Sequence, residues 1–242
     1  MEPAGIGDRV EGLHAVSAAL KAGRVSRLTV ERQSGDAVSE LMASVAGVPV
    51  REVDDLRKVS VTSAPQGIMA DCRPLATKSL TELVAESDNP ALVVLDHVED
   101  PQNVGAVARS ALAAGGSGIV VAARRAAPLG ATAFKAAAGA LEVLPVAVVN
   151  SIADAVQRLE ELEVWTIGLD GSAQESLFGC PLFDQPVAII VGGEGRGLTR
   201  LVSDRVSKLV AIPMAQGAES LNVSVAAALA MFEVRRVRQA TD

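Results

Sequence analysis

The sequence predicts an α/β protein built around a mostly parallel sheet. The first observation is a series of short, continuously apolar runs after residue 90, of the kind that form strands buried on both faces. The second is that patterns with helical spacing separate these runs. The third is a change of composition at residues 76–90, which divides the 242-residue chain into a short front part and a longer second part.

The front part, residues 1–75, alternates between helical and extended patterns. Apolar residues at helical spacing predict two helices, which end before Gly23 and Gly47, at residues 13–22 and 37–46. Three strands are predicted at residues 27–32, 48–53 and 66–71. The size is close to the smallest at which an α/β unit folds alone, so we interpret this part as a separate domain.

Residues 76–90 differ in composition from both neighbouring parts. The segment is rich in Ser, Thr, Glu and Asp and closes with Asn89 and Pro90. Such segments are typical of linkers, so we expect a linker with about one helical turn, which permits movement between the two parts but does not show it.

The second part, residues 91–242, predicts the larger domain. Apolar runs predict six strands, at residues 91–95, 118–122, 143–149, 164–169, 188–191 and 209–212. Helical patterns follow at residues 104–114, 132–138, 152–162, 198–206 and 224–238. Continuous apolar strands that alternate with helices are typical of a parallel sheet covered on both faces.

Composition restricts the functional classes. The net charge is −7, and the aromatic residues are one Trp and four Phe. A general nucleic-acid binder normally has a basic surface, so any RNA contact is expected to be local and to depend on RNA shape. No apolar run reaches membrane-spanning length and no leader pattern is present, which predicts a cytoplasmic protein without membrane contact.

The cysteines and histidines do not indicate a metal site or a disulfide framework. Cys72 and Cys180 are far apart and outside any CxxC pattern, and His14 and His97 are isolated. Metal clusters and disulfide frameworks need such residues at defined spacings. We therefore expect neither a metal nor a disulfide.

The first candidate motif, DHVEDPQNVGAVARSALAAGG at residues 96–116, follows a predicted strand. Asn103 stands where the N-cap of the next helix is expected, a role that requires no further function. Arg109 falls beside the apolar stripe of that helix, among small residues, which suits close approach of a phosphate or of another backbone. A solvated surface arginine is the alternative interpretation.

The second motif is a glycine cluster directly after the apolar run at residues 188–191. It surrounds one carboxylate, Glu194, with four glycines: Gly192, Gly193, Gly195 and Gly197. The spacing fits neither the GxGxxG pattern of dinucleotide folds nor the GxxxxGK[ST] pattern of P-loops, so NAD and ATP are not favoured. Residues without Cβ atoms allow main-chain groups to face an adenosine-like ligand, whereas a tight turn explains only one or two glycines.

The third motif, IPMAQGAESLNVSVAAALAMF at residues 212–232, joins a predicted strand to the last helix. Ser220 is the expected N-cap of that helix, with Leu221 as a hydrophobic staple. Asn222 is polar and lies beside the apolar stripe, so it requires a hydrogen-bonding partner. The second and third motifs together predict a ligand crevice at the carboxyl edge of the sheet.

Taken together and in this order, DPQNVGAVARSA, IIVGGEGRGL and VAIPMAQGAESLNVSVA resemble the three motifs of the SpoU/TrmH branch of the SPOUT RNA methyltransferases. FKAAAGALEVLPV also resembles this family, and the similarity covers about residues 91–239. The front part, from EGLHAVSAALKAG to PQGIMADCRPL, resembles the small ribosomal-protein-like substrate-binding domain of the ribosomal-RNA guanosine ribose methyltransferases.

The resemblance implies transfer of a methyl group from S-adenosylmethionine to a ribose 2′-hydroxyl in large-subunit ribosomal RNA, with guanosine as the expected nucleoside. It also implies a homodimer and a deep trefoil knot in which the last helix passes through a loop. The polar active-site positions of the family correspond to Asn103, Arg109, Glu194, Ser220 and Asn222. The cofactor pocket is expected to involve Leu169, Gly192, Gly193, Gly195, Gly197, Ile212, Met214 and Leu221.

In the family, the position of Arg109 is the one that activates the hydroxyl. An arginine is effectively always protonated in proteins, so it is a poor general base. We expect Arg109 to hold the phosphate beside the target and to stabilise the developing alkoxide, while the proton passes to that phosphate or to water. Glu194 is then expected to orient Arg109 or Asn103.

RNA selection is expected to come mainly from residues 1–75 together with the surface of the dimer. Six basic side chains there are candidate phosphate contacts, although each could equally be a solvated surface charge: Lys21, Arg24, Arg27, Arg51, Arg57 and Lys58. Phosphate contacts position an RNA without reading its bases.

Three other functions are weighed against this interpretation. Transfer RNA is an alternative substrate, because the catalytic motifs hardly distinguish the two RNAs. A non-catalytic RNA-binding assembly factor is disfavoured by the joint presence of the polar motif residues. A nucleotide-dependent oxidoreductase is disfavoured because DHVEDPQNVG, and not GxGxxG, follows the strand at residue 91.

Overall fold

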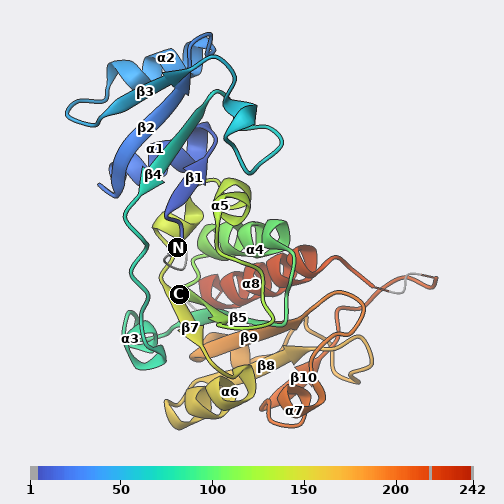
Figure 1. The fold of residues 1–242 in the computed structure, drawn as a ribbon. Coiled ribbons are helices and arrows are strands. Elements are labelled where there is room, and N and C mark those ends of the chain that lie inside the picture. The colour runs from blue at the N-terminus through green and yellow to red at the C-terminus, as the bar shows by residue number, and fades with distance from the viewer. Residues whose placement is uncertain (1–4, 218–219, 241–242) are drawn as a thin grey trace.

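The computed structural model describes residues 5–217 and 220–240 of the 242-residue chain. Two sheets lie one beyond the other along the molecule, joined by the connection at residues 76–90 (Figure 1). Residues 218–219, part of the predicted loop before Ser220, lie outside the described residues. The described part contains no helix that is long and apolar enough to cross a membrane.

The N-terminal unit, up to residue 75, is a four-stranded sheet in the order β1-β4-β2-β3. β2 and β3 are parallel, and the other neighbouring strands are antiparallel. The predicted elements are present with shifted ends, as α1 Leu13–Lys21, β2 Val25–Glu31, α2 Asp36–Ala43, β3 Val50–Val53 and β4 Ile68–Cys72, with a short 3₁₀ helix, η1, at Leu56–Lys58. The edge strand β1, Arg9–Glu11, was not predicted, because three residues are too few to show an alternation.

The second sheet has six strands in the order β10-β8-β9-β5-β6-β7, and all neighbours are parallel, which confirms the predicted parallel sheet. The strands are β5 Ala91–Asp96, β6 Gly118–Ala122, β7 Val146–Val149, β8 Trp165–Leu169, β9 Val187–Gly192 and β10 Lys208–Val210. The strand predicted at residues 143–149 begins three residues late, because the chain first forms the 3₁₀ turn η2, Ala140–Glu142.

Helices cover both faces of this sheet (Figure 1). One face carries α4 Pro101–Ala113, α5 Ala131–Ala137 and α8 Val223–Gln239. The other carries α3 Leu80–Val84, α6 Ile152–Glu161 and α7 Arg200–Ser203. A 3₁₀ turn, η3 Pro181–Asp184, packs against α8 on the first face. Successive residues of β5 alternate between the two cores, with Val93 in the first and Val94 in the second.

The connection at residues 76–90 is packed against the second sheet. Lys78 forms an isolated parallel bridge with Ala147 of β7. Ser79 and Glu82 form a capping box at the start of α3, and Leu83 is fully buried. The polar composition of the segment concealed these contacts, because only a few apolar side chains make them: Leu80, Leu83 and Val84.

The topology places three strand ends side by side. β9 lies between β5 and β8, and β10 lies beyond β8, so the carboxyl ends of β8, β9 and β10 are neighbours. α8 packs against β9 at the same edge. Ligands of open α/β sheets bind at such an edge, where the strand order reverses.

Candidate active site

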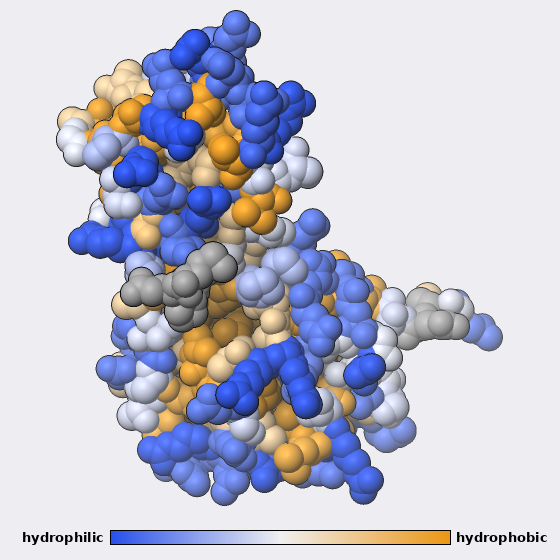
Figure 2. All heavy atoms as spheres, in the orientation of Figure 1, coloured by the Kyte–Doolittle hydropathy of each residue, from blue (hydrophilic) through white to orange (hydrophobic). Residues whose placement is uncertain are grey.

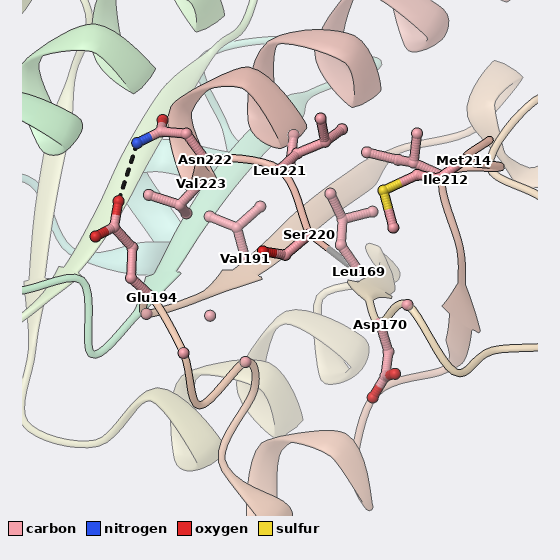
Figure 3. A pocket seen from close by; sticks show the side chains of 16 residues that line it. Leu169, Asp170, Val191, Glu194, Ile212, Met214, Ser220, Leu221, Asn222 and Val223 are labelled. Atoms are coloured by element: carbon pink, nitrogen blue, oxygen red, sulfur yellow. Dashed lines mark hydrogen bonds between the residues drawn. The ribbon is translucent and has the colours of Figure 1, made fainter. Parts of the chain in front are cut away.

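A cavity of about 650 Å³ opens at this edge of the sheet. Its wall comes from the ends of β8 and β9, the loop after β10 and the start of α8 (Figure 3). The volume lies within the range of about 300–1,000 Å³ that is typical of cofactor sites. All the residues that were expected to hold the cofactor line this cavity: Leu169, Gly192, Gly193, Gly195, Gly197, Ile212, Met214 and Leu221.

The glycine loop after β9 folds back on itself. Gly193 forms a bridge with Gly197, and a Cβ atom on Gly192 would come within 2.0 Å of the carbonyl carbon of Gly197. A Cβ atom on Gly193 would come within 2.4 Å of a carbonyl oxygen, whereas Gly195 and Gly197 have φ values of +74° and +63°. Turn geometry therefore explains two of the four glycines, Gly195 and Gly197, as expected, and close approach of the main chain explains Gly192 and Gly193.

Asn103, Glu194 and Asn222 form a closed hydrogen-bonded cluster that joins three separate segments. The Oε1 atom of Glu194 accepts hydrogen bonds from the Nδ2 atoms of Asn103 and Asn222, each at 2.9 Å; Figure 3 shows the second of these. Nδ2 of Asn222 also donates to Oδ1 of Asn103 at 3.0 Å. Of the two contacts expected for Glu194, the one with Asn103 is present.

Both predicted helix caps are wrong. α4 begins earlier than expected, with Asp100 as its N-cap and Pro101 in its first turn, so Asn103 lies inside the helix and is 7% exposed. α8 is capped by Asn222, whose Oδ1 accepts a hydrogen bond from the backbone N–H of Ser224 at 2.9 Å. Ser220 lines the cavity instead. Because its Oδ1 is held by the cap, the amide nitrogen of Asn222 is directed to Glu194.

Arg109 lies apart from this cluster. It is exposed on α4 and lines neither the cavity described above nor its neighbour. Within residues 5–217 and 220–240, its side chain makes no hydrogen bond or ion pair, so the expected contact with Glu194 does not form inside one chain. Six positions separate it from Asn103, which places the two side chains on different faces of the helix.

A second cavity, of about 850 Å³, adjoins the first. Gly193, Glu194 and Gly197 line both cavities, so the glycine loop forms a shared wall. Asn103 lines the second cavity, together with three arginines from different segments: Arg125, Arg196 and Arg200. Glu194 thus stands between a largely apolar cavity and one with several basic side chains.

Two carboxylates of the site belong to no predicted functional set. Asp96 is fully buried at the end of β5 and lies 2.6 Å from both the backbone nitrogen of Thr199 and Nδ1 of His97. Asp170 follows β8, lines the first cavity, and accepts hydrogen bonds from the hydroxyl and backbone N–H of Ser172, which lower its pKa. Their position directly after predicted strands was the available signal.

The basic residues of the N-terminal unit have different environments. Arg24 is buried and paired with Glu142, so its predicted contact with RNA phosphate is wrong. Arg57 is exposed and paired with Asp55. The other four candidates are exposed: Lys21, Arg27, Arg51 and Lys58. Figure 2 shows many hydrophilic residues over the outer end of this unit.

Neither cysteine belongs to a cluster. Cys72 and Cys180 are buried free thiols. The described part of the chain contains no group of three or more His, Cys, Asp or Glu side chains that could hold a metal ion.

Comparison with known proteins gives two family matches. Residues 90–232 match the SpoU rRNA Methylase family, and residues 9–78 match a domain described as RNA 2'-O ribose methyltransferase substrate binding. A 23S rRNA (guanosine-2'-O-)-methyltransferase RlmB from Photobacterium profundum is 36% identical over 246 residues, which cover 96% of this chain and 98% of the relative.

Solved structures show the same similarity. The SpoU methyltransferase AviRb from Streptomyces viridochromogenes, in complex with the cofactor AdoMet, has a TM-score of 0.80 at 25% identity and covers 96% of this chain and 90% of its own. A second solved structure, described as giving insights into the 2-OH methylation of C/U34 on tRNA, has a TM-score of 0.56 at 25% identity. The match covers 64% of this chain and 100% of that structure's chain. The resemblance carried by the three motifs is confirmed, and the chain belongs to the SpoU rRNA methylase family.

Proposed function

We propose that the protein transfers a methyl group from S-adenosylmethionine to the ribose 2′-hydroxyl of a guanosine in large-subunit ribosomal RNA. The observation that carries this proposal is the cluster of Asn103, Glu194 and Asn222 beside a cavity of cofactor size. The RlmB relative, which is named for this reaction, matches the chain over nearly its whole length. The proposed compartment is the cytoplasm.

The first cavity fits S-adenosylmethionine. Leu169, Ile212 and Leu221 offer an apolar wall for the adenine, and the main chain of the glycine loop offers polar groups. Asp170 adds a carboxylate that can accept hydrogen bonds from ribose hydroxyls. When bound, S-adenosylmethionine supplies a methyl group attached to a positively charged sulfonium.

The second cavity is the proposed entrance for the target nucleotide. Arg125 and Arg196 are exposed and suited to contact the phosphates on either side of the nucleotide. Since Glu194 lines both cavities, a ribose in the second would lie next to a cofactor in the first.

Glu194 is the proposed contact of the reacting hydroxyl. Its Oε1 atom is occupied by the two asparagine amides, and no described residue donates a hydrogen bond to Oε2. Oε2 can therefore accept the hydrogen bond of the 2′-hydroxyl and aim its oxygen along the line of transfer. Positioning of this kind provides the largest part of the acceleration, and the proton that the hydroxyl donates passes to Oε2 of Glu194 and from there to water.

Arg109 belongs to this mechanism only if it enters the site of a second copy of the chain. Three apolar side chains form an exposed stripe on α8: Val225, Leu229 and Phe232. A stripe of this kind beside a functional cavity supports a homodimer. In such a dimer Arg109 would hold an RNA phosphate.

The proposal also includes the trefoil knot, in which α8 is threaded through a loop.

Ribosomal RNA is favoured over transfer RNA by the extent of the similarities. The neighbour that methylates tRNA covers 64% of this chain, whereas AviRb and the RlmB relative each cover 96%. The additional length includes the N-terminal unit, whose matched domain is a substrate-binding one.

The first experiment measures transfer of labelled methyl to unmodified large-subunit ribosomal RNA and, separately, to unmodified transfer RNA. We expect label in ribosomal RNA alone, at one nucleotide that becomes resistant to alkaline cleavage, and loss of label with Arg109→Ala. Label in transfer RNA alone would replace the proposed substrate. If the chain neither binds the cofactor nor transfers methyl, it is a non-catalytic RNA-binding factor.

A second experiment separates the dimer from the chemistry. Arg109→Ala and Asn103→Ala chains are co-expressed, so that mixed dimers carry one of each. If Arg109 acts in the partner's site, one site of each mixed dimer is intact, and activity exceeds that of either parent. Activity no higher than the parents would exclude this role for Arg109.

A further inference from the structure

The N-terminal unit and the second unit are joined by a buried ion pair. Nε of Arg24, which precedes β2, donates to Oε2 of Glu142 in η2 at 2.7 Å, and Nη2 donates to Oε1 at 2.5 Å. The two side chains are 10% and 2% exposed. A guanidinium that faces a carboxylate through two parallel hydrogen bonds fixes orientation as well as distance.

The third nitrogen of the Arg24 guanidinium, Nη1, makes hydrogen bonds within the N-terminal unit. Nη1 donates to the carbonyl oxygen of Gly7 at 3.2 Å and to that of Arg73. The guanidinium carbon also lies 5.6 Å from the centre of the Phe134 ring, in α5. Arg24 therefore connects both ends of the N-terminal sheet to α5 and η2.

Other contacts surround this pair. The backbone N–H of Gly7 donates to the carbonyl oxygen of Leu129 at 2.9 Å, and Nζ of Lys135 donates to the carbonyl oxygen of Ala64. Buried side chains of α1 and β2 belong to the same hydrophobic core as those of α4 and α5. The two units are packed against each other, although the polar linker between them would permit movement.

The surface that receives the N-terminal unit is continuous with the active site. α5 packs on α4 so closely that a Cβ atom on Gly105 would come within 2.3 Å of the carbonyl oxygen of Ala133. Gly105 lies two residues after Asn103, whose amide donates to Glu194. A displacement of α5 would therefore reach Asn103 through direct main-chain contact.

We propose that Arg24 and Glu142 are positioning residues for methyl transfer. The ion pair holds the N-terminal RNA-binding unit at one distance and angle from Glu194, so that an RNA bound to that unit presents its target ribose at the site. This inference rests on the proposed function. It follows that RNA selection depends on a fixed geometry between the two units and not only on contacts within the N-terminal unit.

The test uses the full chain with Glu142→Gln, which keeps the shape of the side chain and removes its charge. Asp154→Asn is the matched control, because Asp154 forms a similar pair with Arg205 at 2.8 Å, with its side chain 74% exposed. We expect Glu142→Gln to reduce kcat/KM for unmodified ribosomal RNA by roughly 10- to 100-fold, with unchanged affinity for S-adenosylmethionine. Asp154→Asn should change neither quantity.

A distance measurement separates positioning from general stability. Spin labels at Val50→Cys in β3 and Leu201→Cys in α7 report the separation of the two units, since both positions are exposed and the native cysteines are buried. We expect one narrow distance distribution, which broadens with Glu142→Gln and not with Asp154→Asn. If Glu142→Gln does not fold, Arg24→Lys, which keeps the charge and loses the two-bond geometry, is measured instead.

Three outcomes would overturn the inference. In the first, the distribution of label-to-label distances in Glu142→Gln stays as narrow as in the unaltered protein. In the second, the distribution broadens but Glu142→Gln still transfers methyl to RNA at the full rate. In the third, Glu142→Gln loses transfer only because it no longer binds S-adenosylmethionine. If the unaltered protein methylates no RNA, the proposed function fails, and the distance distributions still decide whether the ion pair fixes the two units.

Discussion

At the scale of single residues, Oε1 of Glu194 is the point where α4, the glycine loop and α8 meet. It accepts both asparagine amides, and Asn222 additionally caps α8. The two residues therefore have separable roles. In the proposed mechanism Glu194 presents its second oxygen to the substrate, whereas Asn222 also sets the course of the loop that lines the first cavity.

Glu194→Gln and Asn222→Ala should consequently differ in kinetics. Glu194→Gln removes the acceptor for the hydroxyl, so we expect turnover to fall by about 100-fold with little change in cofactor affinity. Asn222→Ala should weaken cofactor binding and slow transfer together, because the helix cap is lost as well. Calorimetric titration with S-adenosylmethionine and single-turnover transfer would distinguish them. Equal loss of cofactor affinity in both variants would contradict the separation.

Cys72 gives a pH prediction at the same scale. Burial raises the pKa of its thiol from 9.0 to about 11, with Arg24 opposing the shift and Glu142 adding to it. The unfolded thiol loses its proton at a lower pH than the folded one, so the free energy of unfolding should decrease between about pH 9 and pH 11. Denaturant titrations across this range would measure the slope, and Cys72→Ala should reduce it. If the pH dependence of the unfolding free energy has the same slope in Cys72→Ala, other groups cause the decrease.

At the scale of elements, the glycine loop depends on Asp96. The carboxylate accepts a hydrogen bond from Thr199 at the far end of the loop, and the carbonyl of the same residue accepts one from Gly193 at the near end. A single residue at the end of β5 thus fixes both ends of the loop that separates the two cavities.

Asp96→Asn should loosen this loop. The amide can still accept one hydrogen bond, but it no longer offers a charged acceptor to Thr199, and it presents a donor toward His97. We expect cofactor affinity to fall by about tenfold and the unfolding free energy to fall by roughly 1–3 kcal/mol. Asp204→Asn, on an exposed α7 pair with Arg200, should leave both unchanged. Normal affinity in Asp96→Asn would show that the loop is held by its glycines alone.

The buried strands could be predicted from the sequence, and the exact helix starts could not. Residues 118–122 form β6 as expected, because a short apolar run rich in β-branched residues is typical of a strand buried on both faces. The start of α4 was missed because the apolar stripe begins at Val104, whereas the cap is set by Asp100 and Pro101. The partner of Asn103 lies 91 residues away, and helical spacing gives no indication of such a contact.

At the scale of the whole molecule, composition was a poor guide to independence of the two units. The polar stretch at residues 76–90 indicated a linker, but Lys78 pairs with β7 and Leu83 enters the core. The charge of Arg24 suggested a surface role, whereas its partner, Glu142, is 118 residues distant. Local pattern identifies elements and motifs; the contacts between units depend on tertiary packing that spacing does not encode.

Arg238 connects the C-terminal end of α8 to two other segments of the second unit. Its guanidinium, at the end of α8, donates to four carbonyl oxygens, two at the start of β5 and two around η3: Asn89, Pro90, Phe183 and Gln185. One side chain therefore ties the last helix to the point where the second unit begins. Only an arginine has enough donors in a fixed plane to serve four acceptors at once.

Arg238→Met should lower the stability of the whole chain, since the aliphatic part is kept while the carbonyls of Asn89, Phe183 and Gln185 lose this donor and that of Pro90 keeps the N–H of Val187. We expect a loss of about 2 kcal/mol, which corresponds to a decrease in Tm of roughly 4–8 °C for a chain of this size. Arg235→Met is the matched control, because Arg235 makes a single bond, of 3.3 Å, to the carbonyl oxygen of Ala113. Calorimetry of both variants checks the expectation. Equal shifts in Tm would mean that the stabilisation comes from positive charge at the helix end, an effect that both arginines share.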